Sequence, residues 1–114
     1  MKKIILGILF AFLLTAKAFA GAGFATSAGT IDLTLTSSGT EYSVAIPNGT
    51  GDLNIQSRTA ADFKIAFTSG QSGTTYFTVK SGTVYSLQTA NLYNVTLYAQ
   101  SANNGQVVEI SYWQ

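Results

Sequence analysis

The sequence contains neither histidine nor cysteine, so the commonest general base is missing and carboxylates are the main candidates for catalysis. Three of them, Asp52, Asp62 and Glu109, lie beside turns or on the polar side of alternating segments. Glycoside hydrolysis needs two carboxyl groups about 5–10 Å apart, and a hydrolytic triad needs a histidine or an activated lysine. Carboxylates at such positions are usually exposed to solvent or weakly ion-paired. Asp62 could form such an ion pair with Arg58 or Lys64. We therefore predict that the protein is not an enzyme and has no catalytic residues.

Oxygen-rich turns are the other places where a ligand could be held. Residues 48–52 and 103–105 supply amide, hydroxyl and carboxylate oxygens, but they lack the carboxylate density of a calcium loop. Residues 70–73 lack both the spacing and the following helix of a phosphate-binding loop. Asn and Gly are the ordinary residues of tight turns. These segments are therefore predicted to be turns, with no metal and no cofactor.

Aromatic side chains gather in the second half of the chain, and four of them are candidates for a ligand or interface surface: Tyr76, Tyr85, Tyr98 and Trp113. Tyr76, Tyr98 and Trp113 alternate with apolar neighbours, so each is expected on the opposite strand face from those neighbours. Exposed rings in a row would stack on sugars or anchor a protein interface. If both faces of the sheet are covered, the same rings belong to the core.

Residues 1–20 have the pattern of a secretory signal peptide. Lys2 and Lys3 precede an apolar stretch at residues 4–14, and residues 18–20 form an A-x-A cleavage site. The apolar stretch is too short to span a membrane comfortably, so no permanent membrane anchor is expected after cleavage. The protein is therefore predicted to be exported to the periplasm, the cell surface or the medium.

The remaining chain is predicted to comprise a flexible arm at residues 21–29 and a single domain at residues 30–114. Residues 21–29 are all small except Phe24, which suits a mobile segment. After cleavage, three basic side chains remain against five acidic ones, giving a net charge of −2. This balance leaves no basic surface for nucleic acid.

The domain is predicted to be all-β, an antiparallel β-sandwich or jelly roll of about eight short strands. Short runs of alternating apolar and polar residues recur between glycine-containing turns, at a spacing typical of such folds. Pro47 begins one turn signal, and residues 80–82 read as a hairpin-like turn. Residues 103–105, Asn-Asn-Gly, give the strongest hairpin signal in the chain, because Asn-Gly suits the positive φ angles of primed turns.

Residues 46–113 contain a series of strand and turn motifs: IPNG, LNIQSR, ADFKIAF, TYFTVKSG and GQVVEISYW. In these motifs the chain resembles small β-sandwich accessory proteins of tailed-phage virions and prophages. The resemblance implies a structural or decorating role without catalysis. The signal peptide departs from that pattern, because tailed-phage capsids assemble in the cytoplasm. The departure points to a domain recruited to a secreted role, or to a virus that assembles unusually.

Two functions follow from the sequence. The first is an exported, non-enzymatic structural or accessory subunit of a virion or cell-surface assembly, acting through self-association or other protein contacts. Its arm could add a strand to a neighbour's sheet edge. The alternative is a secreted carbohydrate-binding or adhesion module, in which the four candidate aromatics stack on sugar rings.

Overall fold

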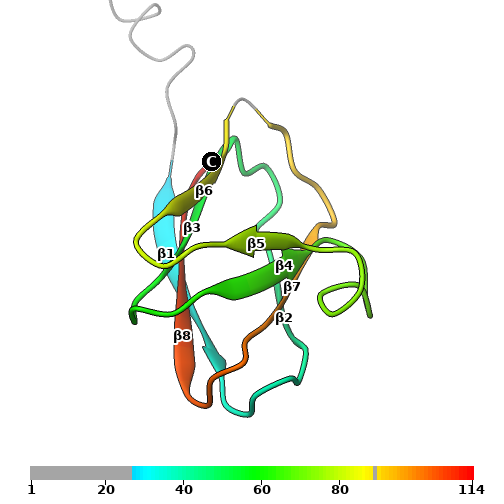
Figure 1. Ribbon diagram of the computed structural model, residues 1–114. Helices are drawn as coiled ribbons and strands as arrows, with labels where there is room; N and C mark the ends of the chain where they lie inside the picture. The colour runs from blue at the N-terminus through cyan, green and yellow to red at the C-terminus, as the bar shows by residue number, and fades with distance from the viewer. Residues whose placement is uncertain (1–26, 89) are drawn as a thin grey trace, which may run out of the picture.

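The computed structural model describes residues 27–88 and 90–114, which form eight β-strands (Figure 1). The predicted signal peptide and most of the predicted arm lie outside the described residues. The strands are β1 (Ala28–Leu35), β2 (Tyr42–Ala45), β3 (Asp52–Ser57), β4 (Phe63–Ala66), β5 (Phe77–Val79), β6 (Val84–Leu87), β7 (Thr96–Gln100) and β8 (Gln106–Trp113). Within the described part of the chain, no helix is long and apolar enough to cross a membrane.

The strands form two four-stranded antiparallel sheets with the orders β1-β8-β3-β6 and β2-β7-β4-β5. The chain changes sheet at every connection except the one between β4 and β5. Two packed antiparallel sheets with this alternating order are the jelly-roll arrangement. The predicted all-β class and two-sheet architecture are confirmed.

The core lies between the two sheets and is built from the alternating apolar positions of the strands. Its fully or almost fully buried members are Leu35, Ile46, Leu53, Ile55, Phe63, Ile65, Val79, Leu97, Ala99, Val108 and Ile110. Burial of each large aliphatic or aromatic side chain stabilises the fold by about 1.5–3 kcal/mol. The intervening residues consequently face outward on both sheets, and these two outer faces are where the polar side chains collect.

The two predicted hairpin turns exist as turns, but neither closes a hairpin. Gly82 and Gly105 have φ angles of 76° and 70°, the left-handed region that glycine reaches most easily. Each turn nevertheless joins strands of different sheets, β5 to β6 and β7 to β8. The Gly105 amide donates to the carbonyl of Leu35, 2.8 Å away, at the end of β1. A positive φ identifies a turn but not whether its flanking strands pair, so the hairpin interpretation was wrong.

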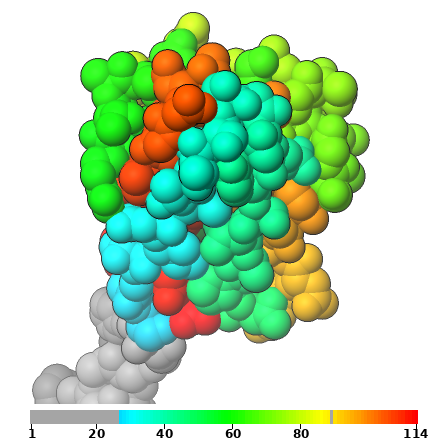
Figure 2. All heavy atoms as spheres, turned by 90° about the horizontal axis from the view of Figure 1, so that it is seen from below, coloured from blue at the N-terminus to red at the C-terminus, as the bar shows by residue number. Residues whose placement is uncertain are grey.

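The first strand starts earlier than the sequence predicts. Ala28 and Gly29, assigned to the arm, pair with Trp113 and Tyr112 of β8. In Figure 2 the cyan start of β1 lies against the red end of the chain. Ala and Gly carry no apolar alternation, which is why the pattern missed them. The strand pairs within its own chain, and the Tyr112 ring packs so closely that a Cβ on Gly29 would lie 2.6 Å from Tyr112 Cζ.

Candidate functional site

The four candidate aromatics do not form one row. Trp113, which is 38% exposed, continues the outward-facing positions of β8 on the β1-β8-β3-β6 sheet. Tyr98 lies on the outer face of the other sheet, paired with Ser43 of β2 and Ala66 of β4. Tyr85 faces inward and packs against the core. The rings therefore belong to three separate surroundings.

Tyr76 lies just before β5 at the edge of the β2-β7-β4-β5 sheet and is 40% exposed. The Lys64 Nζ lies 4.3 Å from the centroid of the Tyr76 ring. Such a cation–π contact holds the ring in place while one side stays open to solvent.

An aromatic cluster lies between the two sheets at the side of the sandwich where β5 and β6 are the edge strands. Tyr85 contacts Phe77 and Phe67 with ring centroids 5.6 and 6.4 Å apart, both in tilted arrangements. Phe77 pairs with the buried Ile65 and points inward, as its alternation predicts. It is nevertheless 58% exposed, because no strand lies beyond β5 to cover it. We call Phe67, Tyr76, Phe77, Val84 and Tyr85 the open edge. Phe67, Phe77 and Tyr85 form the cluster between the sheets, whereas Tyr76 contacts Lys64 and Val84 lies on the outer face of β6.

Charged residues of both signs border the open edge. Lys80 Nζ lies 3.1 Å from Asp62 Oδ2, and the Ser81 amide donates to Asp62 Oδ1 over 2.7 Å. These two contacts, the Ser81 amide first, lower the pKa of Asp62 below its usual value. The ion pair proposed for Asp62 with Arg58 or Lys64 was wrong. The register pairs Lys64 with Thr78 and Gln100, and Arg58 lies at the end of β3 in the other sheet.

Glu41 fixes the loop that leads to the open edge. Its Oε1 accepts the Gly70 amide at 2.8 Å, and its Oε2 accepts the Ser72 amide at 3.0 Å and the Ser72 hydroxyl. The Ser72 hydroxyl is the largest cause of the lowered pKa of Glu41. Ser72 itself is fully buried. One carboxylate therefore organises the loop between β4 and β5 that positions Tyr76 and Phe77.

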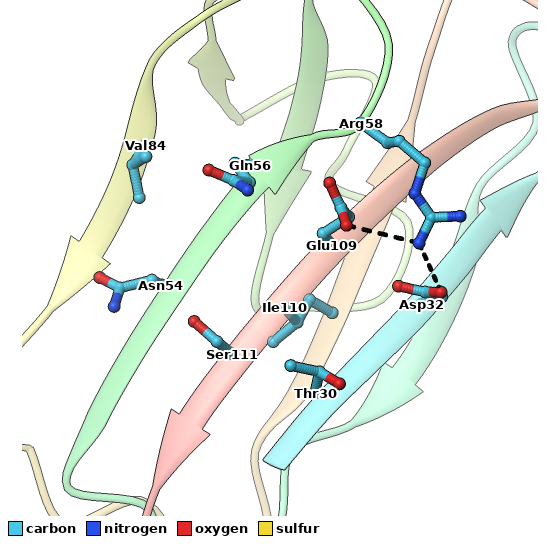
Figure 3. A pocket seen from close by; sticks show the side chains of 9 residues that line it. All are labelled: Thr30, Asp32, Asn54, Gln56, Arg58, Val84, Glu109, Ile110 and Ser111. Atoms are coloured by element: carbon cyan, nitrogen blue, oxygen red, sulfur yellow. Dashed lines mark hydrogen bonds and ion pairs between the residues drawn. The ribbon is translucent and has the colours of Figure 1, made fainter. Parts of the chain in front are cut away.

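The outer face of the β1-β8-β3-β6 sheet carries a polar trough of about 460 Å³ (Figure 3). Its lining residues are Thr30, Asp32, Asn54, Gln56, Arg58, Val84, Glu109, Ile110 and Ser111. Arg58 Nη2 lies 2.6 Å from Asp32 Oδ2 and 3.4 Å from Glu109 Oε2. Asp32 first, and Glu109 second, raise the pKa of Arg58. Arg58 thereby bridges β1 and β8 across the top of the trough.

The three carboxylates considered for catalysis do not meet. Glu109 lines the trough, Asp52 lies further along the same face, and Asp62 borders the open edge. Asp52 pairs with Trp113 and Glu109 with Gln56, so four residues of strand, about 14 Å, separate them. That separation exceeds the spacing of a glycosidase pair. Among the described residues, no group of three or more acidic, histidine or cysteine side chains is placed to hold a metal ion.

Five polar residues of the trough were not among the candidates from sequence: Thr30, Asp32, Asn54, Gln56 and Ser111. Each alternates with core residues, so the pattern does place it on an outer face. The pattern does not show that β1, β8 and β3 are neighbours, because β8 lies between two strands that precede it by more than 45 residues. Only the sheet order brings these side chains together.

No protein-family model matches the chain, and no curated protein matches it. A solution NMR structure of a de novo designed double-stranded beta-helix is similar, with a TM-score of 0.46 and 16% sequence identity. The alignment covers 78% of this chain and 100% of that chain. A likeness at this level says nothing about function. The resemblance to tailed-phage accessory proteins thus stays a prediction from the sequence.

Proposed function

We propose that the protein is an exported, non-enzymatic subunit of a virion or cell-surface assembly and that it associates with further copies of itself. The observation that carries this proposal is the open edge. Five large hydrophobic side chains are conspicuously exposed among the described residues, and three of them, Tyr76, Phe77 and Val84, lie at this edge. Apolar side chains gathered at one place and rimmed by polar residues are typical of protein interfaces.

The chemistry of the edge favours a second copy as its occupant. Full burial of a phenylalanine side chain stabilises an interface by about 1.5–3 kcal/mol, and Phe77 still has more than half of its surface to bury. The rim holds Lys80 and Asp62 side by side. A copy related by a two-fold axis would place opposite charges of such a rim against each other.

Side chains, rather than a continued sheet, would make most of this contact. The β5 strand has only three residues and β6 only four, and short edge strands give a poor template for pairing with another chain. The rings of Phe77 and Tyr85 already contact each other, so little side-chain order would be lost on association.

The resemblance to virion accessory proteins and the signal peptide supply the biological setting of the proposal. Jelly rolls occur in viral capsid proteins and in lectins, so the fold is compatible with an assembly subunit without selecting it. The absence of histidine and cysteine from the sequence supports a role without catalysis.

The test is the solution mass of the exported protein, measured by light scattering over a concentration series. The wild-type protein should associate as concentration rises, and Phe77→Asp should stay monomeric because a charge cannot be buried there without a partner. Tyr93→Asp is the matched control, since Tyr93 is 60% exposed and lies outside the open edge. A wild-type protein that stays monomeric, or a Phe77→Asp variant that associates like the control, would refute the proposal.

A further inference from the structure

The outer face of the β1-β8-β3-β6 sheet carries two hollows, which share only Val84 with the open edge. The trough described above shares Asn54 with a second hollow of about 230 Å³, lined by Asp52, Asn54, Gln88 and Trp113. The two hollows form one hydrogen-bonding surface that ends at the indole ring. Figure 3 shows the side chains of the larger hollow projecting from β1, β8, β3 and β6.

The sheet register arranges this surface in three cross-strand rows. The first row is Asp32, Glu109, Gln56 and Val84, and the second is Thr30, Ser111, Asn54 and Ser86. The third contains Trp113 paired with Ala28 on one side and Asp52 on the other. Successive rows are two residues apart, about 7 Å, so the surface runs about 14 Å along the strands. It is long enough for an extended ligand rather than a single small molecule.

The side chains of the rows select a polar ligand that both donates and accepts hydrogen bonds. Amides, hydroxyls, carboxylates and one guanidinium alternate across the trough, and its only aliphatic lining residues are Val84 and Ile110. A lipid or an apolar peptide would leave these groups without partners, which is costly. Hydroxyl groups can act both as donors and as acceptors, so a polyol matches the mixed lining.

The charge of the face selects against anions. Arg58 is already engaged by Asp32 and Glu109, and Asp52 adds a third carboxylate along the surface. The net charge of these four groups is negative, so phosphates, nucleic acids and acidic polysaccharides are repelled. The fixed Arg58 bridge also holds the two carboxylates in place as acceptors.

Trp113 supplies the apolar contact that such a ligand needs. Its side chain is 38% exposed and lies beside Asp52 at the end of the surface. Aromatic rings combine a large flat apolar face with low mobility, and that face matches the C–H groups on one side of a sugar ring. We propose that this face binds a neutral oligosaccharide, with Trp113 stacking on one sugar and the amides and carboxylates of the rows binding its neighbours.

The sequence offers a direct probe, because Trp113 is its single tryptophan. The exported protein would be titrated with neutral cello-, malto-, laminari- and N-acetylchito-oligosaccharides, and with an acidic oligogalacturonate, while Trp113 emission is recorded. At least one neutral oligosaccharide should shift the emission saturably, and the oligogalacturonate should not. Absence of any shift with the neutral series, or binding of the acidic sugar alone, would overturn the proposal.

Variants then assign the site. Asn54→Ala should weaken binding at least tenfold by the same titration, and Trp113→Ala should abolish retardation in affinity gels containing the bound polysaccharide. Tyr93→Ala is the aromatic control, because Tyr93 lines neither hollow, and it should bind like wild type, as should Phe77→Asp. Retained binding by Trp113→Ala would refute the role of this face. Because Phe77 lines neither hollow and Trp113 is not part of the open edge, loss of self-association in Phe77→Asp and loss of sugar binding in Trp113→Ala report on the two proposals independently.

Discussion

Replacing Glu41 by alanine should loosen the loop between β4 and β5 without changing the core. The substitution removes the acceptor for three hydrogen bonds, from the Gly70 amide and from the amide and hydroxyl of Ser72. Ser72 is fully buried, so its two donors would lose their partner in a place that water reaches poorly. A buried donor left without an acceptor costs about 1–3 kcal/mol. Allowing for rotation of the hydroxyl, we expect a loss of about 2–3 kcal/mol in the free energy of unfolding.

Urea unfolding followed by circular dichroism at one fixed protein concentration measures this loss. With a slope of roughly 1–2 kcal/mol/M for so small a domain, the midpoint should fall by about 1–3 M. Thr40→Ala is a suitable control because Thr40 is the exposed neighbour of Glu41. Equal midpoints for Glu41→Ala and the control would refute the idea that this carboxylate organises the loop.

The same carboxylate makes stability depend on pH. Its pKa is lower in the folded chain than the ordinary value of 4.5, chiefly because the Ser72 hydroxyl donates to it. Ionised Glu41 therefore stabilises the fold fully above about pH 4.5, and this contribution is lost as the pH falls through the lower folded pKa. Glu41→Gln should show a smaller decline in stability over this acidic range than wild type, and an unchanged decline would contradict the assignment.

Two further predictions concern the start of the chain. Gly29→Ala should lower the free energy of unfolding by about 1–3 kcal/mol because its Cβ would overlap the Tyr112 ring. Gly51→Ala should be nearly neutral, because its Cβ would meet nothing closer than 3.7 Å. Equal urea midpoints for the two variants would contradict the close packing at Gly29. Mass spectrometry of the exported protein should give a chain that begins at Gly21, and a product that retains residues 1–20 would contradict the predicted cleavage.

The sequence predicted more of the fold than of the candidate site. Alternation in segments such as Ile31–Leu35 or Val95–Ala99 predicts both the strands and the side that enters the core, because period-two patterns reflect local geometry. Turn signals failed to give the pairing: Asn104-Gly105 predicts a turn, but the chain there passes between sheets. Local sequence specifies backbone conformation, whereas pairing depends on contacts between distant segments.

The same limit explains the candidate surfaces. Phe77 follows the inward alternation of β5, yet it is exposed because β5 is an edge strand. Only the sheet order reveals that β5 lies at an edge. Trp113 was a candidate from its outward position, yet its neighbour Asp52 comes from a strand more than 50 residues earlier. Alternation could assign a face to each residue, but the partners on that face became apparent only in the folded sheet.

The most direct test of self-association through the open edge uses the absence of cysteine from the sequence. Thr78→Cys places a single thiol on the edge strand β5, and Thr34→Cys places one on β1 at the opposite edge of the sandwich; both positions are exposed. Each variant would be treated with a short bismaleimide at a concentration at which wild type associates. Our account predicts a covalent dimer for Thr78→Cys and little for Thr34→Cys. Equal cross-linking of both variants, or dimers from Thr34→Cys alone, would contradict it.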